Sequence, residues 1–543
     1  PVATLNVALT LSPVLSALAM YVLLRRWVSW APAAFVGGLL YGFSPFILVA
    51  LGDAHLMLAM APIAPLIVAC LDELLVRQHR RPVATGALLG LFVTVQFFIG
   101  SEMLVLTLIA AAIGVVLVVV FNVGRIEVIR RKARHAAVAV TAAVVTAGAL
   151  LAYPVWFALA GPAHLSGPIW GVSLISYGGT DLKDYAVPAA PSLSAAAVAH
   201  QFGGYQGPLL SGQYFGIGLL AVLAVGLVIW RRDLRLWLFA AVGVVAVPLS
   251  FGLQFHSWTL WRLFVRLPLM ESVIPSRFLL ISYLAAAVML GLIVDHARTS
   301  VIGWAGSRSS GGAAWPGAAS VVGVAIAAVA LVPISWYDAG GLPLTTPAVA
   351  LPAWFRVVAP HLTGHQVLLT LPLPGLQESP MTWQAVDSMS YAMVGGGGPN
   401  SLSERFGRQR AAHDYLSTLS IGAGYSRTIT TAEVAFVRQA LRGWGVTMVV
   451  VVDQAGLPAY DQTPLVHTAV TMMTAVTGQL PRHQAHAWVW AGVGAAGPPV
   501  LAPTGWLTAC SVGSPRDTPA SDTPTALFAS ANCVLAAPAA QAR

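Results

Sequence analysis

The chain has 543 residues, of which 57% are hydrophobic and only 9% are Asp, Glu, Lys or Arg. Soluble domains carry about 25% charged residues, so this composition excludes a soluble enzyme, and its high hydrophobicity excludes intrinsic disorder. The formal net charge of +9 would suit a protein that binds polyanions only if the basic residues gathered on a binding surface. The three cysteines are too few for a disulfide scaffold or a zinc ribbon.

Ten apolar stretches are long enough to cross a bilayer, whose hydrocarbon core needs about 20 residues per helix. Prolines lie inside some of them, where neighbouring helices can satisfy the carbonyl groups that a proline leaves unpaired. We therefore predict a polytopic α-helical membrane protein with about ten spans, at residues 3–24, 33–51, 56–71, 83–100, 103–122, 137–159, 212–230, 236–252, 277–294 and 317–334.

The loops between these stretches alternate in charge. Five alternate loops hold fifteen Lys and Arg residues, whereas the loops of the opposite set hold Lys183, Arg262 and Arg266. Cytoplasmic loops are enriched in Lys and Arg, so the alternation predicts a multi-pass plasma-membrane protein with both ends of this chain outside the cytoplasm. Because the chain opens at Pro1 without a basic leader, we expect one further span upstream, and so eleven in all.

The positive charge therefore indicates orientation and no nucleic-acid partner. Residues 335–543 carry ten Arg and ten acidic residues, so the whole net charge belongs to the membrane part. The partner that the composition does imply is the lipid bilayer.

Three regions follow from this organisation. Residues 1–334 form the membrane module, with a long outer loop at 160–211. Residues 335–492 form an extracytoplasmic α/β domain, because β-rich runs at 367–371 and 446–452 flank a helical pattern at 431–444. The Pro-, Ala- and Thr-rich tail at 493–543 is expected to contain a disulfide between Cys510 and Cys533, since oxidation is permitted outside the membrane.

A metal site is one interpretation of Asp53 and His55, which lie two residues apart in a tight outer turn. A carboxylate and an imidazole at this spacing can converge on one divalent cation, with Mg²⁺ or Mn²⁺ as the expected cofactor. The alternative is that both side chains end helices and face water.

Other polar residues at the outer ends of spans are further candidates, because an ionisable group near hydrocarbon is costly. Glu102 could assist a metal or act as a base, although an acid at a helix start also suits the helix dipole. Arg277 could bind the phosphate of a lipid-linked substrate through two oxygens, or could extend towards the headgroups. Arg262 and Arg266, among tryptophans, indicate an interfacial helix that could lie under such a lipid.

Several short motifs resemble the GT-C superfamily of multi-span glycosyltransferases, and most closely its poorly characterised actinobacterial members. The similarity extends over nearly the whole chain. It is carried by the runs 37–45 (GGLLYGFSP), 53–56 (DAHL), 71–77 (LDELLVR), 96–102 (QFFIGSE), 275–278 (PSRF), 381–384 (MTWQ) and 488–490 (WVW).

The resemblance implies an enzyme that takes a sugar from a polyprenyl-phosphate donor and passes it to an envelope glycan, lipid or protein on the extracytoplasmic face. It also implies a metal-binding D-x-H motif in the second outer loop, which Asp53 and His55 match once an upstream span is counted. The catalytic acid of the first outer loop would lie before Pro1, so the chain as given is expected to be inactive. Two alternatives remain open: a transporter or flippase of lipid-linked glycans, and a non-catalytic envelope assembly protein of the same fold.

Overall fold

A computed structural model describes most of the chain. The described residues are 2–52, 54–161, 179–187, 212–253, 259–265, 267, 270, 273–306, 315–339, 350–362, 366–374, 379–396, 411–413, 415–416, 431–455, 457, 463 and 466–493. They form two compact units, the first from the residues up to 339 and the second from residue 350 onward. Asp53, Arg266, Cys510 and Cys533 lie outside them, as do most of the 160–211 loop and nearly all of the 493–543 tail.

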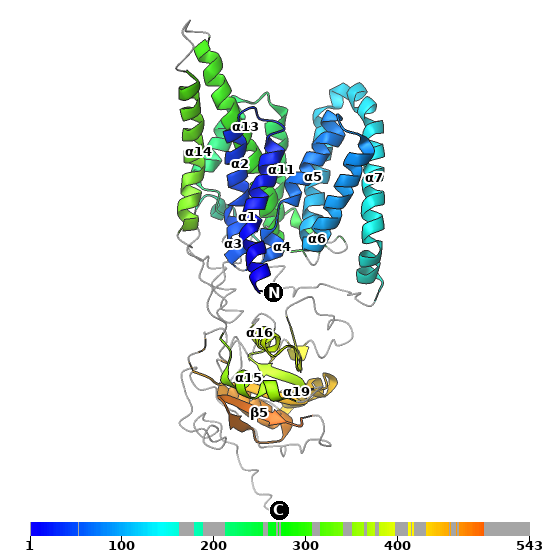
Figure 1. Cartoon of the computed structure of the whole chain (residues 1–543), viewed down its shortest axis with the longest axis vertical. Coiled ribbons are helices and arrows are strands. Elements are labelled where there is room, and N and C mark those ends of the chain that lie inside the picture. The colour runs from blue at the N-terminus through cyan, green and yellow to red at the C-terminus, as the bar shows by residue number, and fades with distance from the viewer. Residues whose placement is uncertain are drawn as a thin grey trace, which may run out of the picture. The chain divides into compact units, whose positions relative to one another are not determined.

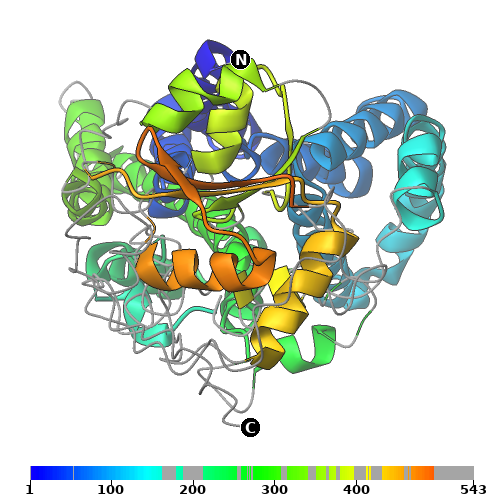
Figure 2. The same ribbon diagram turned by 90° about the horizontal axis from the view of Figure 1, so that it is seen from below.

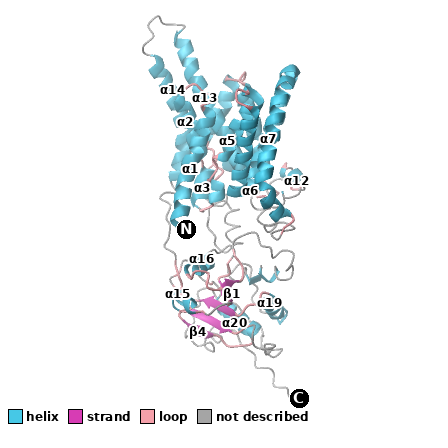
Figure 3. Cartoon of the chain, turned by 45° about the vertical axis from the view of Figure 1, so that its right-hand side comes forward, coloured by secondary structure: helices cyan, strands magenta, loops and turns pink. Residues whose placement is uncertain are grey.

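The described residues of the first unit form helices joined by turns and loops, and no strand (Figures 1 and 3). Its long helices run side by side, as Figure 1 shows. The elements are α1 (Val2–Leu24), α2 (Ala31–Gly42), α3 (Pro45–Gly52), α4 (Leu56–Ala59), α5 (Ile63–Asp72), the π-helical turn η1 (Glu73–Arg77), α6 (Pro82–Phe121), η2 (Val123–Arg125), α7 (Ile126–Leu159), η3 (Leu182–Tyr185), α10 (Ile217–Ile229), α11 (Leu234–Ser250), α12 (Trp261–Phe264), η5 (Pro275–Phe278), α13 (Leu279–Gly306) and α14 (Trp315–Ala339).

Six of the described helices are long and apolar enough to cross a membrane, or seven if the bent pair α2 and α3 is one span. The predicted class, a helical membrane protein that also contains a small sheet, is confirmed at this level. The predicted count of ten spans is not. Helices α10 and α11 are apolar but have only 13 and 17 residues, and α6 extends over 40 residues with a kink inside it.

Helix α6 nevertheless turns back on itself at Gly100, where the backbone is extended (φ −174°, ψ 104°). A Cβ on Gly86 would lie 2.0 Å from the carbonyl oxygen of Ala139, and one on Gly90 would lie 2.5 Å from that of Ala143. The first half of α6 therefore runs parallel to α7. Helix α7 begins just after α6 ends, so a straight α6 packed against α7 would run antiparallel to it. The parallel direction of the first half of α6 therefore requires the chain to reverse at Gly100.

Prolines break other predicted spans, and neighbouring helices compensate for the breaks. Helices α2 and α3 meet at an angle of 43°, just before Pro45. The predicted span 56–71 is divided into α4 and α5 before Ile63. At this second break, Tyr41 donates a hydrogen bond to the carbonyl of Ala61 (2.8 Å), and the Ala61 N–H reaches the hydroxyl of Ser16 (3.2 Å).

Helix α13 is the centre of the first unit, because its apolar stretch is buried all round. It packs against α2, α11 and α14. Helix α2 approaches α13 closely at Gly37, since a Cβ there would lie only 2.6 Å from the carbonyl oxygen of Ala287. Gly42 similarly permits contact with the backbone of α1. Small residues allow such backbone approaches between membrane helices, so the glycines of the 37–45 motif have a packing role.

The second unit is a five-stranded sheet with the order β2-β1-β3-β5-β4. The first three strands are parallel, and β5 is antiparallel to both β3 and β4. Its elements are α15 (Ala353–Val357), η6 (Ala359–His361), β1 (Val367–Leu371), α16 (Ser379–Val386), β2 (Ala392–Met393), α19 (Thr431–Gly443), β3 (Met448–Val452), α20 (Val466–Thr477), β4 (Arg482–Gln484) and β5 (Ala487–Ala491).

Helices cover both faces of this sheet (Figure 2). Successive strand residues point to opposite faces. Leu369, Val449 and Trp488 pack with α19 and α20, whereas Leu368 and Val450 pack with α15 and α16. Burial on both faces explains why β1 and β3 read as continuous apolar runs in the sequence.

Candidate functional site

Two predicted site residues, Glu102 and Arg277, form an ion pair in the first unit. The Arg277 Nη1 contacts the Glu102 Oε2, and the other carboxylate oxygen accepts a hydrogen bond from the Ile274 N–H at 2.8 Å. The Arg277 side chain is only 10% exposed and that of Glu102 is 17% exposed. The guanidinium and the backbone N–H thus converge on one carboxylate that lies more than 170 residues away in the sequence.

The position of Arg277 is fixed by its neighbours. Pro275 starts the 3₁₀ turn η5 after the extended Ile274. The Phe278 ring meets the ring of Trp261 edge-on, with centroids 6.1 Å apart, and Trp261 is fully buried. A buried guanidinium is stable only when it is paired, which accounts for the close contact with Glu102.

The predicted outer turns lie next to one another at this end of the helices. A Cβ on Gly100, two residues before Glu102, would be 3.3 Å from the Cβ of Met57, two residues after His55. A Cβ on Gly252 would lie 3.4 Å from Pro275. The start of α4, the reversal of α6 at Gly100, the end of α11 and the turn η5 are therefore neighbours, although they are distant in the sequence.

A buried hydroxyl cluster attaches the described part of the 160–211 loop to this end. Ser250 donates its one proton to the Val247 carbonyl (2.6 Å). Its oxygen must therefore accept from Thr180 (2.6 Å) and Tyr185 (2.8 Å). The Tyr185 and Phe215 rings lie 5.2 Å apart, next to Tyr283. The sequence contained no signal for this cluster, because isolated hydroxyl residues are common at span ends.

The other predicted site residues are placed less closely. Arg262 is exposed on the single turn α12, directly after the buried Trp261, and Arg266 lies outside the described residues. His55 is half-buried before α4 and takes part in a further interaction. Among the described residues, no three His, Cys, Asp or Glu side chains are grouped to hold a metal. Since Asp53 is not described and Glu102 is bonded to Arg277, the described residues do not complete a metal site, which stays a prediction.

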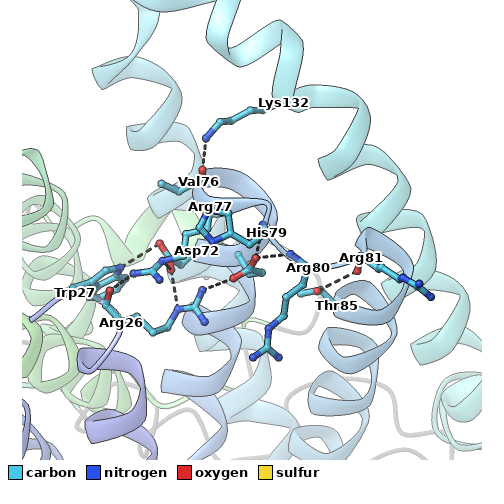
Figure 4. A network of polar contacts seen from close by, with 11 residues as sticks. Arg26, Trp27, Asp72, Val76, Arg77, His79, Arg80, Arg81, Thr85 and Lys132 are labelled. Carbon is cyan, nitrogen blue, oxygen red and sulfur yellow. Dashed lines mark hydrogen bonds and ion pairs between the residues drawn. The ribbon is translucent and has the colours of Figure 1, made fainter.

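The five basic loops meet at the opposite end of the same helices. Figure 4 shows one network of polar contacts there. Arg26 contacts Asp72 (Nε to Oδ2, 2.8 Å) and Glu73 (Nη2 to Oε2, 2.6 Å), and Arg77 also contacts Asp72 (2.9 Å). The Gln78 amide donates to the Lys132 carbonyl (3.0 Å), which joins the second and third basic loops.

The remaining basic loops are joined through α13. Asp295 accepts hydrogen bonds from Ser29 and from the Trp30 N–H (2.8 Å) and so caps the start of α2. His296 contacts Asp233 at 2.8 Å. Burial alone would raise the pKa of Asp233. Hydrogen bonds from His296 and Arg235 have the larger opposite effect and hold that pKa well below its usual range. The acids Asp72, Glu73 and Asp295 were missed as site residues because their partners come from distant helices.

Comparisons with known proteins give one match. No family model matches the sequence, and no curated protein matches it. The arabinofuranosyltransferase AftD from Mycobacteria is structurally similar over 90% of this chain and 34% of that chain, with 14% identity and a TM-score of 0.45. The chain spans about a third of the length of AftD, and a similarity at this level assigns no activity.

Proposed function

We propose that the chain belongs to an integral membrane glycosyltransferase. The enzyme would transfer a sugar from a polyprenyl-phosphate donor to an envelope glycan, lipid or protein on the extracytoplasmic face. The observation that carries the proposal is the buried pair of Glu102 and Arg277, located where the predicted outer turns meet. The sequence motifs that resemble GT-C enzymes supply the reaction class.

The proposed topology has ten spans in this chain. The reversal of α6 at Gly100 supports two spans in place of one, and α10 and α11 match two further predicted stretches. The five basic loops are linked by contacts at one end, which supports their lying on one side of a membrane. By the positive-inside rule that end is cytoplasmic, which leaves Arg277 outside.

The chemistry follows from the charge that develops on the leaving group. The bond between the sugar carbon and the phosphate oxygen breaks, and the acceptor hydroxyl oxygen forms the new bond to that carbon. Its proton passes to a carboxylate base. The planar guanidinium of Arg277 can hold two phosphate oxygens and stabilise their negative charge. A divalent metal at Asp53 and His55 would supply further positive charge there.

A transfer assay tests the proposal. The full-length natural protein is reconstituted in proteoliposomes with a radiolabelled polyprenyl-phosphate sugar and an envelope glycan fraction. We expect label to move to the glycan when both face the same side as the second unit. Movement of intact donor across the bilayer without transfer would instead support a flippase. If neither transfer nor movement occurred, the result would support an assembly protein.

A further inference from the structure

Arg277 and Ile274 resemble an anion-binding site that already holds an anion, the carboxylate of Glu102. We propose that Glu102 is an internal competitor at a phosphate site, and that a lipid-linked phosphate displaces it from Arg277 and the Ile274 N–H. Identification of that phosphate as the one on the sugar donor rests on the proposed function. The displacement itself does not.

The donors of this site are organised independently of Glu102. Both belong to the segment 274–277, which Pro275 stiffens and which Phe278 anchors against Trp261. Carboxylates and phosphates are recognised alike by an arginine fork and a backbone N–H. The site would therefore keep its shape when one oxyanion replaces the other.

Glu102, in contrast, comes from a different element and is the more exposed member of the pair. It follows the extended residue Gly100 at the reversal of α6, and its neighbour Ser101 is exposed. Its side chain is 17% exposed against 10% for Arg277. An incoming ligand would therefore approach the pair from the Glu102 side.

The buried charge of Arg277 explains why Glu102 leaves only when a phosphate replaces it. If Glu102 left without a replacement, the guanidinium would remain buried and unpaired, which is strongly unfavourable. An incoming phosphate restores the pairing as the carboxylate leaves.

Binding of a polyprenyl monophosphate to the 543-residue chain in lipid nanodiscs, measured by native mass spectrometry, tests the proposal. Removing the competing charge with Glu102→Gln should tighten binding about tenfold, which corresponds to about 1.4 kcal/mol. The matched control Ser101→Ala should leave binding unchanged, and Arg277→Gln should weaken it at least tenfold. Equal or weaker binding by Glu102→Gln would overturn the proposal.

Two additions keep the outcomes distinct. Glu102→Asp retains a charge on a shorter side chain, so its affinity should lie between those of wild type and Glu102→Gln if all three are folded. Phosphatidylglycerol in excess should compete poorly, and equal competition would refute selectivity for the polyprenyl phosphate over a headgroup. Tighter binding by Glu102→Gln without sugar transfer by the natural protein would refute only the proposed function. Transfer without tighter binding would refute only the exchange.

Discussion

The network around Asp72 gives the sharpest stability prediction. The substitution Asp72→Asn preserves the shape of the side chain but removes its charge. In the structure, one Asp72 oxygen contacts Arg26 at 2.8 Å and Arg77 at 2.9 Å, and the other accepts from Trp27 at 3.2 Å. The Asp72 side chain is 7% exposed, so the lost charge is in a poorly solvated place.

The magnitude follows from what each arginine retains. Breaking a buried ion pair by removing one partner costs about 3–5 kcal/mol. Arg26 keeps its contact with Glu73, and the Arg77 side chain is 32% exposed and is partly solvated. We therefore expect a loss of about 2–3 kcal/mol, in the range of one or two hydrogen bonds to charged groups.

Unfolding in mixed micelles by titration with a denaturing detergent measures this loss. The control is Lys183→Ala, because Lys183 is 71% exposed and lies 3.5 Å from Asp181. Such surface pairs contribute about 0.2–1 kcal/mol. If the two variants lowered the free energy of unfolding equally, the account of Asp72 as a buried link between helices would be refuted.

Three further predictions concern packing, hydrogen bonding and pH. Gly86→Val should prevent stable folding, because its Cβ would lie 2.0 Å from the Ala139 carbonyl oxygen. The control Gly114→Val should fold, because a Cβ at Gly114 has no atom within 4 Å. The folded yield of each variant, measured by size-exclusion chromatography, checks this, and equal yields would contradict it. Ser250→Ala removes the acceptor of two buried hydroxyl groups and should cost about 1–3 kcal/mol in the same detergent titration; an unchanged midpoint would contradict the buried cluster. Burial raises the pKa of Asp387, so folding favours its protonated form, and Asp387→Asn should stabilise the second unit at neutral pH. This gain should disappear as the pH falls through the raised pKa of Asp387 towards its pKa in the unfolded chain. Hydrogen exchange of the second unit in both proteins, measured from pH 7 to 3.5, checks this, and a gain that stayed constant over this range would contradict it.

Local features of the fold could be predicted from the sequence because they depend on local composition. A run of apolar residues must be helical in a membrane, and the start of α1 differs by one residue from the predicted 3–24. Strand β1 has the predicted bounds 367–371. The break at Gly100 lies between the predicted spans 83–100 and 103–122, because the apolar run there is about twice the length of one span.

The contacts between distant segments could not be predicted. Glu102 and Arg277 were each singled out, but their pairing depends on how α6 and α13 pack. Asp72 and Asp295 read as ordinary charges at helix ends, and only the packing shows that each serves another helix. Spatial arrangement of this kind leaves no trace in periodicity or composition.

Sugar transfer by Arg277 variants of the full-length natural protein tests the central claim most directly. Arg277→Ala should lower the initial rate of transfer from a radiolabelled polyprenyl-phosphate sugar at least a hundredfold, because removing one preorganised charge from a transition state costs about 10²–10³ in rate. Lys183→Ala, which removes a cation whose side chain is 71% exposed in the same unit, should retain most of the activity. Undiminished transfer by folded Arg277→Ala protein would contradict the assignment of this site.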